Sequence, residues 1–357
     1  MQTAEAPLTL MKDAAAAPAF PMNRWWVAGS PWELADNPLA RPLLNRRVVF
    51  FRGARGVAAA LEDRCCHKEL PLSCGAIEER GLRCGYHGLL FDAAGKCIEI
   101  PGQANIPPKA RVRSYPVVEQ DRILWIWISA DPQAVPADSP PRYAVHDDPR
   151  YKYGGNSFHY DAPYQLIHDN LLDLSHLGYV HTKTIGGNPQ LHMNAEIRTS
   201  GDEESVKVVR LMPGSEPPPT YAAAWPFQGR IDRWQEVVFH PSHCEIWTGA
   251  MGAGTGSLED PQREGFHMRG FHGVTPETET TAHYLWTIAT NPHPDKQDVT
   301  KLVVDQTAAT FEEDKVIIEA QWQNQKHFAQ RKQVVIHVDA GPSRARRIIE
   351  RLRRPAG

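Results

Sequence analysis

The sequence predicts an α+β protein in two parts, an all-β N-terminal domain followed by an α+β domain with an antiparallel sheet. Three features of the 357-residue chain support this prediction. Short β-like runs separated by proline and glycine fill the first third of the chain. A proline-rich stretch at 130–143 then interrupts the pattern, and beyond it strands mix with long helices. We therefore expect two domains, 1–135 and 136–357.

Each element follows from its local pattern. In the first domain, β-branched and aromatic runs predict the strands 48–51, 57–61, 89–91 and 123–128. In the second domain, the same criteria and helical periodicity predict a helix at 164–177, strands at 206–212, 234–239 and 282–290, a long helix at 306–323 and a basic amphipathic helix at 343–354. Two long loops are expected at 213–227 and 248–265.

Composition limits the function classes. The net charge is −3, from 39 basic and 42 acidic residues, which gives no electrostatic support for nucleic-acid binding. The N-terminal 20 residues are too weakly hydrophobic for a signal peptide, and no apolar run approaches the ~20 residues that span a bilayer. Six cysteines without a disulfide pattern suit a reducing compartment. We expect a soluble, cytoplasmic protein with no membrane segment, in which Cys74, Cys97 and Cys244 are small buried residues.

Two short Cys–His motifs are the strongest chemical signal. Cys65 and His67 are followed, after sixteen intervening residues, by Cys84 and then His87. Two cysteines and two histidines in this arrangement fit a Rieske [2Fe–2S] centre, in which the cysteines hold one iron and the histidines hold the other. Such a centre accepts and donates single electrons.

A zinc site is the alternative for these four ligands, since tetrahedral Cys2His2 is a common zinc set. Zinc fingers usually pair cysteine with cysteine and histidine with histidine, whereas each turn here is mixed. Apolar residues after each motif, at 70–72 and 88–90, favour a shielded cluster whose outer histidine edges stay accessible.

A second metal site is indicated by Asn170, Asp173, His176 and His181. The first three form one stripe on a helix. On an unbroken helix the two histidines would lie about 140° apart, so we expect Gly178 to break the helix and turn His181 inward. Non-haem Fe(II) sites use two histidines and one carboxylate and leave positions open for O2 and substrate.

The carboxylate is expected from the helix that contains 311–315. Phe311, Asp314 and Ile318 share its buried face, whereas Glu312 and Glu313 point toward solvent. A buried acid is costly unless it is paired or bound to metal, so Asp314 is the predicted ligand. A hydrogen-bonded polar seam between helices is the alternative for these residues. Asp173 could accept the second ring N–H of His176 or reach a cluster histidine of another subunit, and Asn170 is expected beside the iron as a polar neighbour.

Together, these motifs resemble the terminal components of Rieske non-haem iron oxygenases, in the branch of vanillate O-demethylase and dicamba monooxygenase. The resemblance covers nearly the whole chain. It implies that Cys65, His67, Cys84 and His87 hold the cluster, that His176, His181 and Asp314 hold a mononuclear Fe(II), and that Asp173 is the electron bridge. The segment 269–279 resembles a substrate-contacting segment, which makes His272 a pocket candidate. Cys66 and Lys68 stand where the family usually has proline and arginine.

The resemblance implies an oxidoreductase that uses O2 and reductase-supplied electrons to hydroxylate or O-demethylate an aromatic, carboxylated substrate. Ring dihydroxylation of an aromatic acid of the phthalate type is the alternative. The chain has no glycine-rich dinucleotide fingerprint, so an NAD(P)H-dependent reductase, with or without a ferredoxin, is expected as partner. A homotrimer is also implied. Two other classes stay open, an electron carrier and a structural or hydrolytic zinc protein. Arg269 or His272 is expected to pair with the substrate carboxylate.

Overall fold

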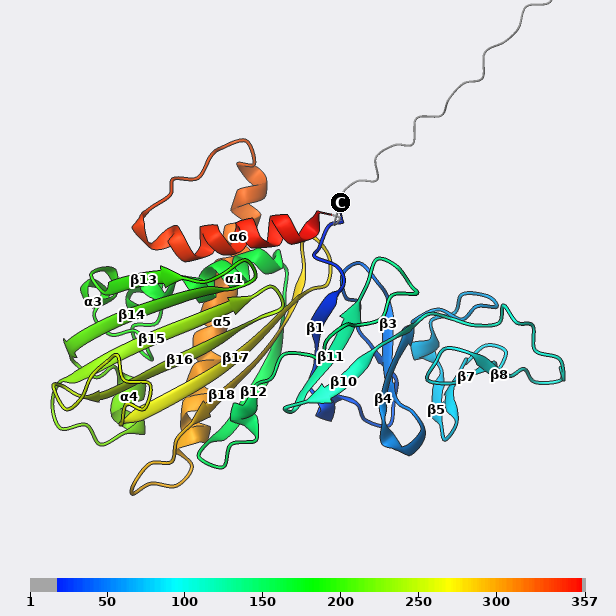
Figure 1. Cartoon of the computed structure of the whole chain (residues 1–357), viewed down its shortest axis with the longest axis horizontal. Coiled ribbons are helices and arrows are strands. Elements are labelled where there is room, and N and C mark those ends of the chain that lie inside the picture. Colours follow the sequence, from blue (N-terminus) through cyan, green and yellow to red (C-terminus); the bar gives the residue numbers. More distant parts are fainter. Residues whose placement is uncertain (1–17, 355–357) are drawn as a thin grey trace, which may run out of the picture.

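The computed structural model describes residues 18–354 and shows two domains that lie end to end (Figure 1). The expectation that residues 1–20 are no signal peptide falls almost entirely outside this range. No helix within the described residues is long and apolar enough to cross a membrane. The predicted boundary at 135/136 falls in the irregular segment between the last strand of the first domain and the first strand of the second, and it stays a prediction.

The first domain is all-β. Its strands are β1 (Arg24–Gly29), β2 (Leu39–Ala40), β3 (Val48–Arg52), β4 (Ala58–Glu62), β5 (Ala76–Glu78), β6 (Gly81–Arg83), β7 (Leu90–Phe91), β8 (Cys97–Glu99), β9 (Ser114–Tyr115), β10 (Val117–Gln120) and β11 (Ile123–Ile128). They form three antiparallel sheets with the orders β1-β11-β10, β2-β3-β4-β9 and β5-β6-β7-β8. Buried Phe51, Leu61, Leu82 and Phe91 pack in one core between the last two sheets. The β5–β8 sheet lies at the end of the molecule that is remote from the second domain (Figure 1).

The second domain is built on a seven-stranded antiparallel sheet of order β12-β18-β17-β16-β15-β14-β13. Its strands are β12 (Lys152–Tyr160), β13 (Glu196–Ser200), β14 (Val206–Ser215), β15 (Ile231–His240), β16 (His243–Gly252), β17 (Phe266–Pro276) and β18 (Ala282–Thr290). Its helices are α1 (Tyr164–Leu172), α2 (Leu177–Val180), α3 (Pro189–Met193), α4 (Pro219–Ala224), α5 (Val299–His327) and α6 (Ala340–Arg353).

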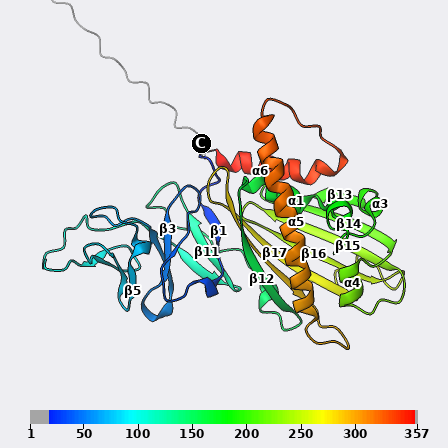
Figure 2. The same ribbon diagram turned by 180° about the vertical axis from the view of Figure 1, so that it is seen from behind.

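Helix α5 crosses one face of this sheet, as Figure 2 shows. Its buried residues include Val303, Thr307, Phe311, Asp314 and Ile318, which recur every three or four positions and so form one stripe toward the sheet. Helix α1 contacts α5 and β17, and α6 packs against α1 and β14. A functional site on α1 and α5 therefore lies between these helices and the sheet.

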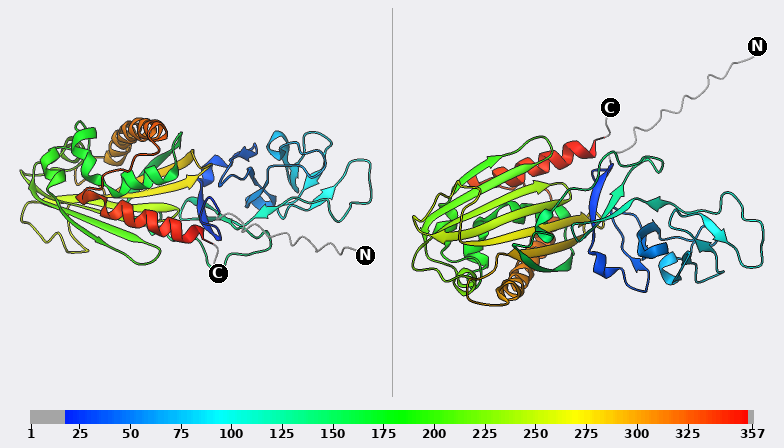
Figure 3. Two further views of the ribbon diagram at one scale, coloured as in Figure 1. Left: turned by 90° about the horizontal axis from the view of Figure 1, so that it is seen from above. Right: turned by 60° about the horizontal axis from the view of Figure 1, so that its bottom comes forward.

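The two domains are joined through β1, which lies at their junction in Figure 3. Thr275 Oγ1 donates a hydrogen bond to the Val27 carbonyl at 2.7 Å. A Cβ added at Gly273 would come within 2.6 Å of the Val27 side chain. The absence of a side chain at Gly273 thus allows β17 to approach β1 closely.

Several predicted elements differ from the structure. The helix predicted at 164–177 ends at Leu172, because Asp173 adopts non-helical angles (φ −113°, ψ 87°) and starts a new turn at 174–176. The break is therefore at Asp173 and not at Gly178. Gly178 lies within α2, where an added Cβ would be 2.4 Å from Pro189 Cα, so it serves close packing against α3.

The two predicted loops are also partly regular. Residues 219–224 form α4 within the first of them. β16 extends to Gly252, so the second loop begins later than predicted. Cys97 and Cys244 are buried as expected, but Cys74 is exposed, because it ends a short turn on the surface of the first domain.

Candidate metal centres and substrate pocket

The two Cys–His motifs form two turns with the same backbone hydrogen bonds. Cys65 N–H donates to the Leu70 carbonyl (2.8 Å) and Glu69 N–H donates to the Cys65 carbonyl (3.0 Å). In the second turn, Cys84 N–H donates to Leu89 (2.8 Å) and Gly88 N–H donates to Cys84 (3.1 Å). The residue four positions after each cysteine is left-handed, with φ of 62° at Glu69 and 71° at Gly88. These matched turns present the two Cys–His pairs in equivalent ways.

The four side chains differ in exposure as a Rieske centre requires. Cys65 and Cys84 are each 2% exposed, whereas His67 and His87 are exposed and their ring centroids are 4.5 Å apart. Burial raises the pKa of the Cys65 thiol to about 11, so a positive metal centre is needed to keep it a thiolate at neutral pH.

The spacing of these ligand atoms argues against a single zinc ion. Ligands about 2.0–2.3 Å from one tetrahedral ion lie within about 4 Å of one another. Among the described residues, no three of Cys65, His67, Cys84 and His87 have ligand atoms that all lie within 4.8 Å. A two-iron cluster, with the thiols on one iron and the imidazoles on the other, fits this wider spacing.

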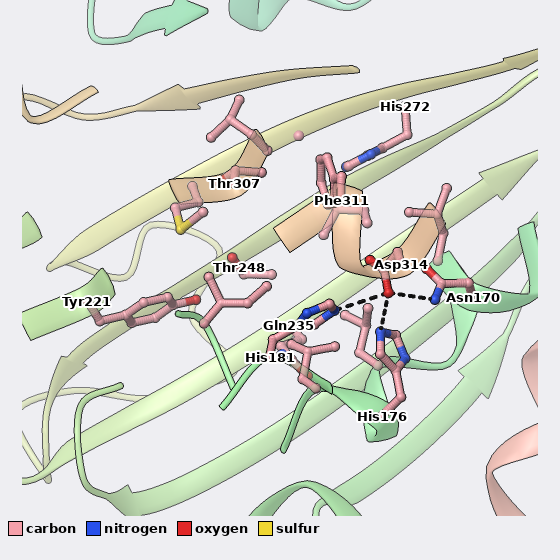
Figure 4. A pocket seen from close by; sticks show the side chains of 18 of the residues that line it. Asn170, His176, His181, Tyr221, Gln235, Thr248, His272, Thr307, Phe311 and Asp314 are labelled. Carbon is pink, nitrogen blue, oxygen red and sulfur yellow. Dashed lines mark hydrogen bonds and ion pairs between the residues drawn. The ribbon is translucent and has the colours of Figure 1, made fainter. Parts of the chain in front are cut away.

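His176, His181 and Asp314 come together between α1, α2 and α5. His181 Nε2 lies 3.1 Å and His176 Nε2 lies 3.3 Å from the same oxygen, Asp314 Oδ1, as Figure 4 shows. Ligands that share one ion at about 2.1 Å lie about 3.0–3.4 Å apart, so the three side chains have the spacing and chemistry of a two-histidine, one-carboxylate iron site.

A second layer of contacts orients these three side chains. Asn170 Nδ2 donates to Asp314 Oδ1 at 3.0 Å. The Nδ1 atom of His176 lies 2.5 Å from the Asp173 carbonyl, and that of His181 lies 2.7 Å from Glu313 Oε2. Both imidazoles therefore present Nε2 to the same point, with the other ring nitrogen fixed by an acceptor.

Two predicted contacts are corrected here. The His176 ring is held by the backbone carbonyl of Asp173 and not by its carboxylate, which instead accepts from Ser175 N–H at 2.9 Å and caps the turn. Glu313 does not only face solvent, since its carboxylate contacts His181 although its side chain is 44% exposed. In the sequence, only the run of acidic residues around Asp314 pointed to Glu313. Its long side chain allows the carboxylate to contact His181 from a partly exposed position.

Electrostatics at the triad favour a carboxylate. Burial alone would raise the pKa of Asp314, but the hydrogen bonds from His176 and His181 outweigh it and hold that pKa well below its usual range. Burial would lower the pKa of His181, but the bonds to Asp314 and Glu313 raise it. A bound cation would take the place of the proton on His181.

A narrow pocket adjoins the triad, with a free volume of about 60 Å³. Apolar side chains from α1, α2, α5 and strands β16–β18 supply most of its lining surface, and β15 contributes Arg233 and Gln235. A ring-sized ligand requires flexible walls such as Met268 to move. His272 lies in this pocket, 1% exposed, with Nδ1 2.7 Å from the Tyr284 hydroxyl. Burial lowers the pKa of His272 to about 3, so its imidazole is neutral at pH 7.

Arg269, the other predicted carboxylate partner, does not line this pocket. Pocket-lining Met268 and Gly270 flank it on β17, so its side chain points to the opposite face of the sheet. There its guanidinium stacks 3.7 Å over the Trp247 ring. Sequence reasoning also missed Arg233 and Gln235, although they are polar residues at inward positions of β15, between Ile231 and Val237.

Comparisons with known proteins agree with these features. Residues 24–116 match the Rieske [2Fe-2S] domain, and residues 160–355 match the vanillate O-demethylase oxygenase C-terminal domain. The chain is 37% identical to a toluene-4-sulfonate monooxygenase system iron-sulfur subunit from Comamonas testosteroni, over 93% of this chain and 97% of that protein. It is 35% identical to a vanillate O-demethylase oxygenase subunit from a Pseudomonas species, over 93% and 95% of the two chains.

The fold is likewise similar to a solved structure. The crystal structure of dicamba monooxygenase bound to dicamba superimposes with a TM-score of 0.85 at 32% identity, covering 94% of this chain and 98% of that one. The chain therefore belongs to the vanillate O-demethylase family of Rieske non-haem iron oxygenases, oxidoreductases that carry a Rieske [2Fe–2S] cluster and a non-haem iron.

Proposed function

We propose that this chain is the terminal oxygenase component of a multicomponent system that hydroxylates or O-demethylates an aromatic acid. The observation that carries the proposal is the convergence of His176, His181 and Asp314 on one point beside a mostly apolar pocket. When bound, the cluster would supply single electrons and the mononuclear iron would supply the site of O2 reduction. The vanillate, dicamba and toluene-4-sulfonate relatives support an aromatic substrate.

The chain's own residues then have separate tasks. Cys65, His67, Cys84 and His87 would hold the cluster, and His176, His181 and Asp314 would hold the iron. Asn170 and Glu313 would orient those ligands through the hydrogen bonds described above. The apolar walls exclude water and orient the ring, and His272 remains a candidate for substrate contact near the triad.

We also propose that the chain works as a homotrimer in which a cluster serves the iron of a neighbouring subunit. Within one chain, the β5–β8 sheet beside the Cys–His turns lies at the far end of the molecule from α1 and α5 (Figure 1). Asp173 and His176 line a second cavity of about 580 Å³, which is bordered by exposed Val334 and Val335. Exposed apolar residues at such a rim favour a protein partner.

Asp173 is suited to bridge two subunits. One of its oxygens caps the turn at Ser175, and its carbonyl holds the His176 ring. The other oxygen could accept an N–H from His67 or His87 of a neighbouring subunit. Electrons would come from a separate NAD(P)H-dependent reductase, with or without a ferredoxin. The four cysteines that the cluster does not use, Cys66, Cys74, Cys97 and Cys244, are free thiols, which supports a cytoplasmic setting for this system.

Substitution of Asp314 tests the proposal. Asp314→Ala is expected to lose mononuclear iron and turnover but to keep the reduced-cluster EPR signal, so the metal count falls from about three irons per chain to about two. Glu312→Ala, on an exposed neighbouring residue, is the control and is expected to keep all the iron. Retention of three irons in Asp314→Ala, or a wild-type protein with zinc and no EPR signal, would overturn the proposal.

A further inference from the structure

Two arginines lie buried on β14 and β15 without carboxylate partners. Arg210 and Arg233 are each 1% exposed, and within residues 18–354 their guanidinium groups donate to the backbone carbonyls of 185, 186 and 192 and not to carboxylates. Burial lowers the pKa of Arg210 to about 10; the charge of Asp173 opposes this shift and the charge of Arg233 adds to it. A guanidinium so far from water is costly unless an anion compensates its charge.

Arg233 is the member of this pair that lines the pocket. Its Nη1 donates to the Gly186 carbonyl at 3.3 Å and its Nη2 donates to the Ile185 carbonyl at 3.2 Å, both long bonds. Its guanidinium carbon lies 4.7 Å over the ring of Tyr221. The Nε atom is buried and has no partner among the described residues. Arg233 is thus fixed in position with a charge and a donor left unused.

The neighbours of Arg233 add polar groups to the pocket, Tyr221 beside Arg233 and Gln235 nearer to His181 (Figure 4). Gln235, two residues further along β15 and also 1% exposed, has an unpartnered Oε1. In Figure 4, the Tyr221 phenol enters the pocket from the left, whereas the triad lies to the right, with Thr248 between them. The pocket therefore has a cationic, polar end and a metal-binding end.

The sheet register places His272 away from this cationic end. Arg233 pairs with Ala250, and Ala250 pairs with Phe266 on β17. His272 follows Phe266 by six residues, which is roughly 20 Å along the strand. His272 instead packs against Phe311, one turn from Asp314. One small carboxylate cannot contact both Arg233 and His272.

We propose that Arg233 binds the anionic group of the substrate, a carboxylate or sulfonate, and thereby directs the opposite side of the aromatic ring to the triad. The inference rests on the proposed oxygenase function and specifies its substrate class as aromatic anions whose oxidised substituent lies remote from the anionic group. Arg233 offers a charge-assisted donor to the anionic group, and the Tyr221 hydroxyl offers a further O–H donor. His272 then contacts the ring or the substituent rather than the anionic group.

Pairs of ligands that differ only in charge can distinguish anion binding by Arg233 from a purely structural role. In the structural role, Arg233 would only hold the 185–186 loop through its hydrogen bonds. Binding to the iron-loaded protein is measured by anaerobic calorimetry with toluene-4-sulfonate and its neutral sulfonamide, and with vanillate and vanillamide. The wild type is expected to bind an anion more tightly than the matching amide. Arg233→Met should weaken anion binding by at least roughly 30-fold and leave amide binding within about threefold. Arg233→Lys should restore part of the loss, and His272→Gln should weaken the acid and the amide equally.

Three results would overturn the inference. The first is that Arg233→Met weakens the binding of anions and amides equally. The second is that the wild type binds neither anion more tightly than its matching amide. The third is that His272→Gln weakens the binding of anions but not of amides. Iron content and the cluster EPR signal are recorded on the same samples. Normal metal content with charge-independent binding refutes only the role of Arg233, whereas absence of the cluster or the iron refutes the proposed function itself.

Discussion

At the scale of single residues, each triad histidine depends on one acceptor at its Nδ1 atom. The backbone carbonyl of Asp173 fixes His176, and no substitution of the Asp173 side chain removes that acceptor. His181 depends on the Glu313 carboxylate at 2.7 Å. An acceptor at this position orients the imidazole and increases its basicity as a metal ligand. Glu313 is therefore the more vulnerable of the two supports.

We expect Glu313→Gln to weaken mononuclear iron binding by about 10- to 100-fold, because an amide replaces the charged acceptor of the His181 N–H. Iron retention is measured by dialysis against a graded chelator, with the cluster absorbance as an internal reference. Glu312→Gln is the matched control, since Glu312 is exposed on the same helix. Equal iron retention in both variants would show that the Glu313 contact does not support the site.

At the scale of elements, the two cluster turns reach the same conformation with different residues. The left-handed position is Glu69 in the first turn and Gly88 in the second. The first turn accommodates the Glu69 side chain, because that side chain points into solvent and is 74% exposed. At Gly88 an added Cβ would lie 2.9 Å from Pro101 Cγ. Only the second turn thus requires glycine.

We expect Gly88→Ala to destabilise the cluster domain by about 1–2 kcal/mol, since a left-handed alanine is strained and also meets Pro101. The urea concentration at which the cluster absorbance is lost measures this effect. Glu69→Ala is expected to leave that midpoint nearly unchanged, because Glu69 already has a Cβ at the same angles. Similar losses in the two variants would contradict this account of the turns.

At the scale of the whole molecule, burial of neutral histidines links stability to pH. Besides His192 and the pocket-lining His272, burial lowers the pKa of five histidines below the ordinary 6.5. They are His146, His168 (to about 3), His240, His267 and His283 (each to about 4). Between about pH 4 and 6.5 the unfolded chain binds these protons and the folded chain does not. Their stabilising contribution is complete above pH 6.5 and is lost progressively below it. His181, whose pKa is raised, acts in the opposite direction.

The urea midpoint of unfolding, followed by circular dichroism, should therefore fall between pH 7.5 and 5.5. Each such group can remove up to about 1.4 kcal/mol per pH unit once its unfolded form is protonated. Glu33, Glu236 and Glu277 have lowered pKa values, so their contribution is lost only at lower pH. His283→Gln, which can still donate to the Pro42 carbonyl, should show a smaller decrease. A midpoint that stays constant over this range would contradict the prediction.

The sequence by itself determined the two-part fold and most strand and helix positions, and it predicted two metal-binding motifs. Cysteine and histidine at short spacing are rare and chemically specific, so these motifs predict the cluster ligands without knowledge of the fold. Strand β18 and the buried stripe of α5 followed from periodicity, which depends on local geometry alone.

Tertiary structure decided what depends on contacts between distant segments. The reach of Glu313 to His181, the orientation of Arg269 away from the pocket and the position of Arg233 in the pocket all depend on partners far away in the chain. Periodicity specifies which face of an element is apolar, but not which other element packs against that face. The local sequence therefore predicted the candidate metal ligands, whereas packing of the sheet against α1 and α5 determined how those side chains are oriented and which residues line the pocket beside them.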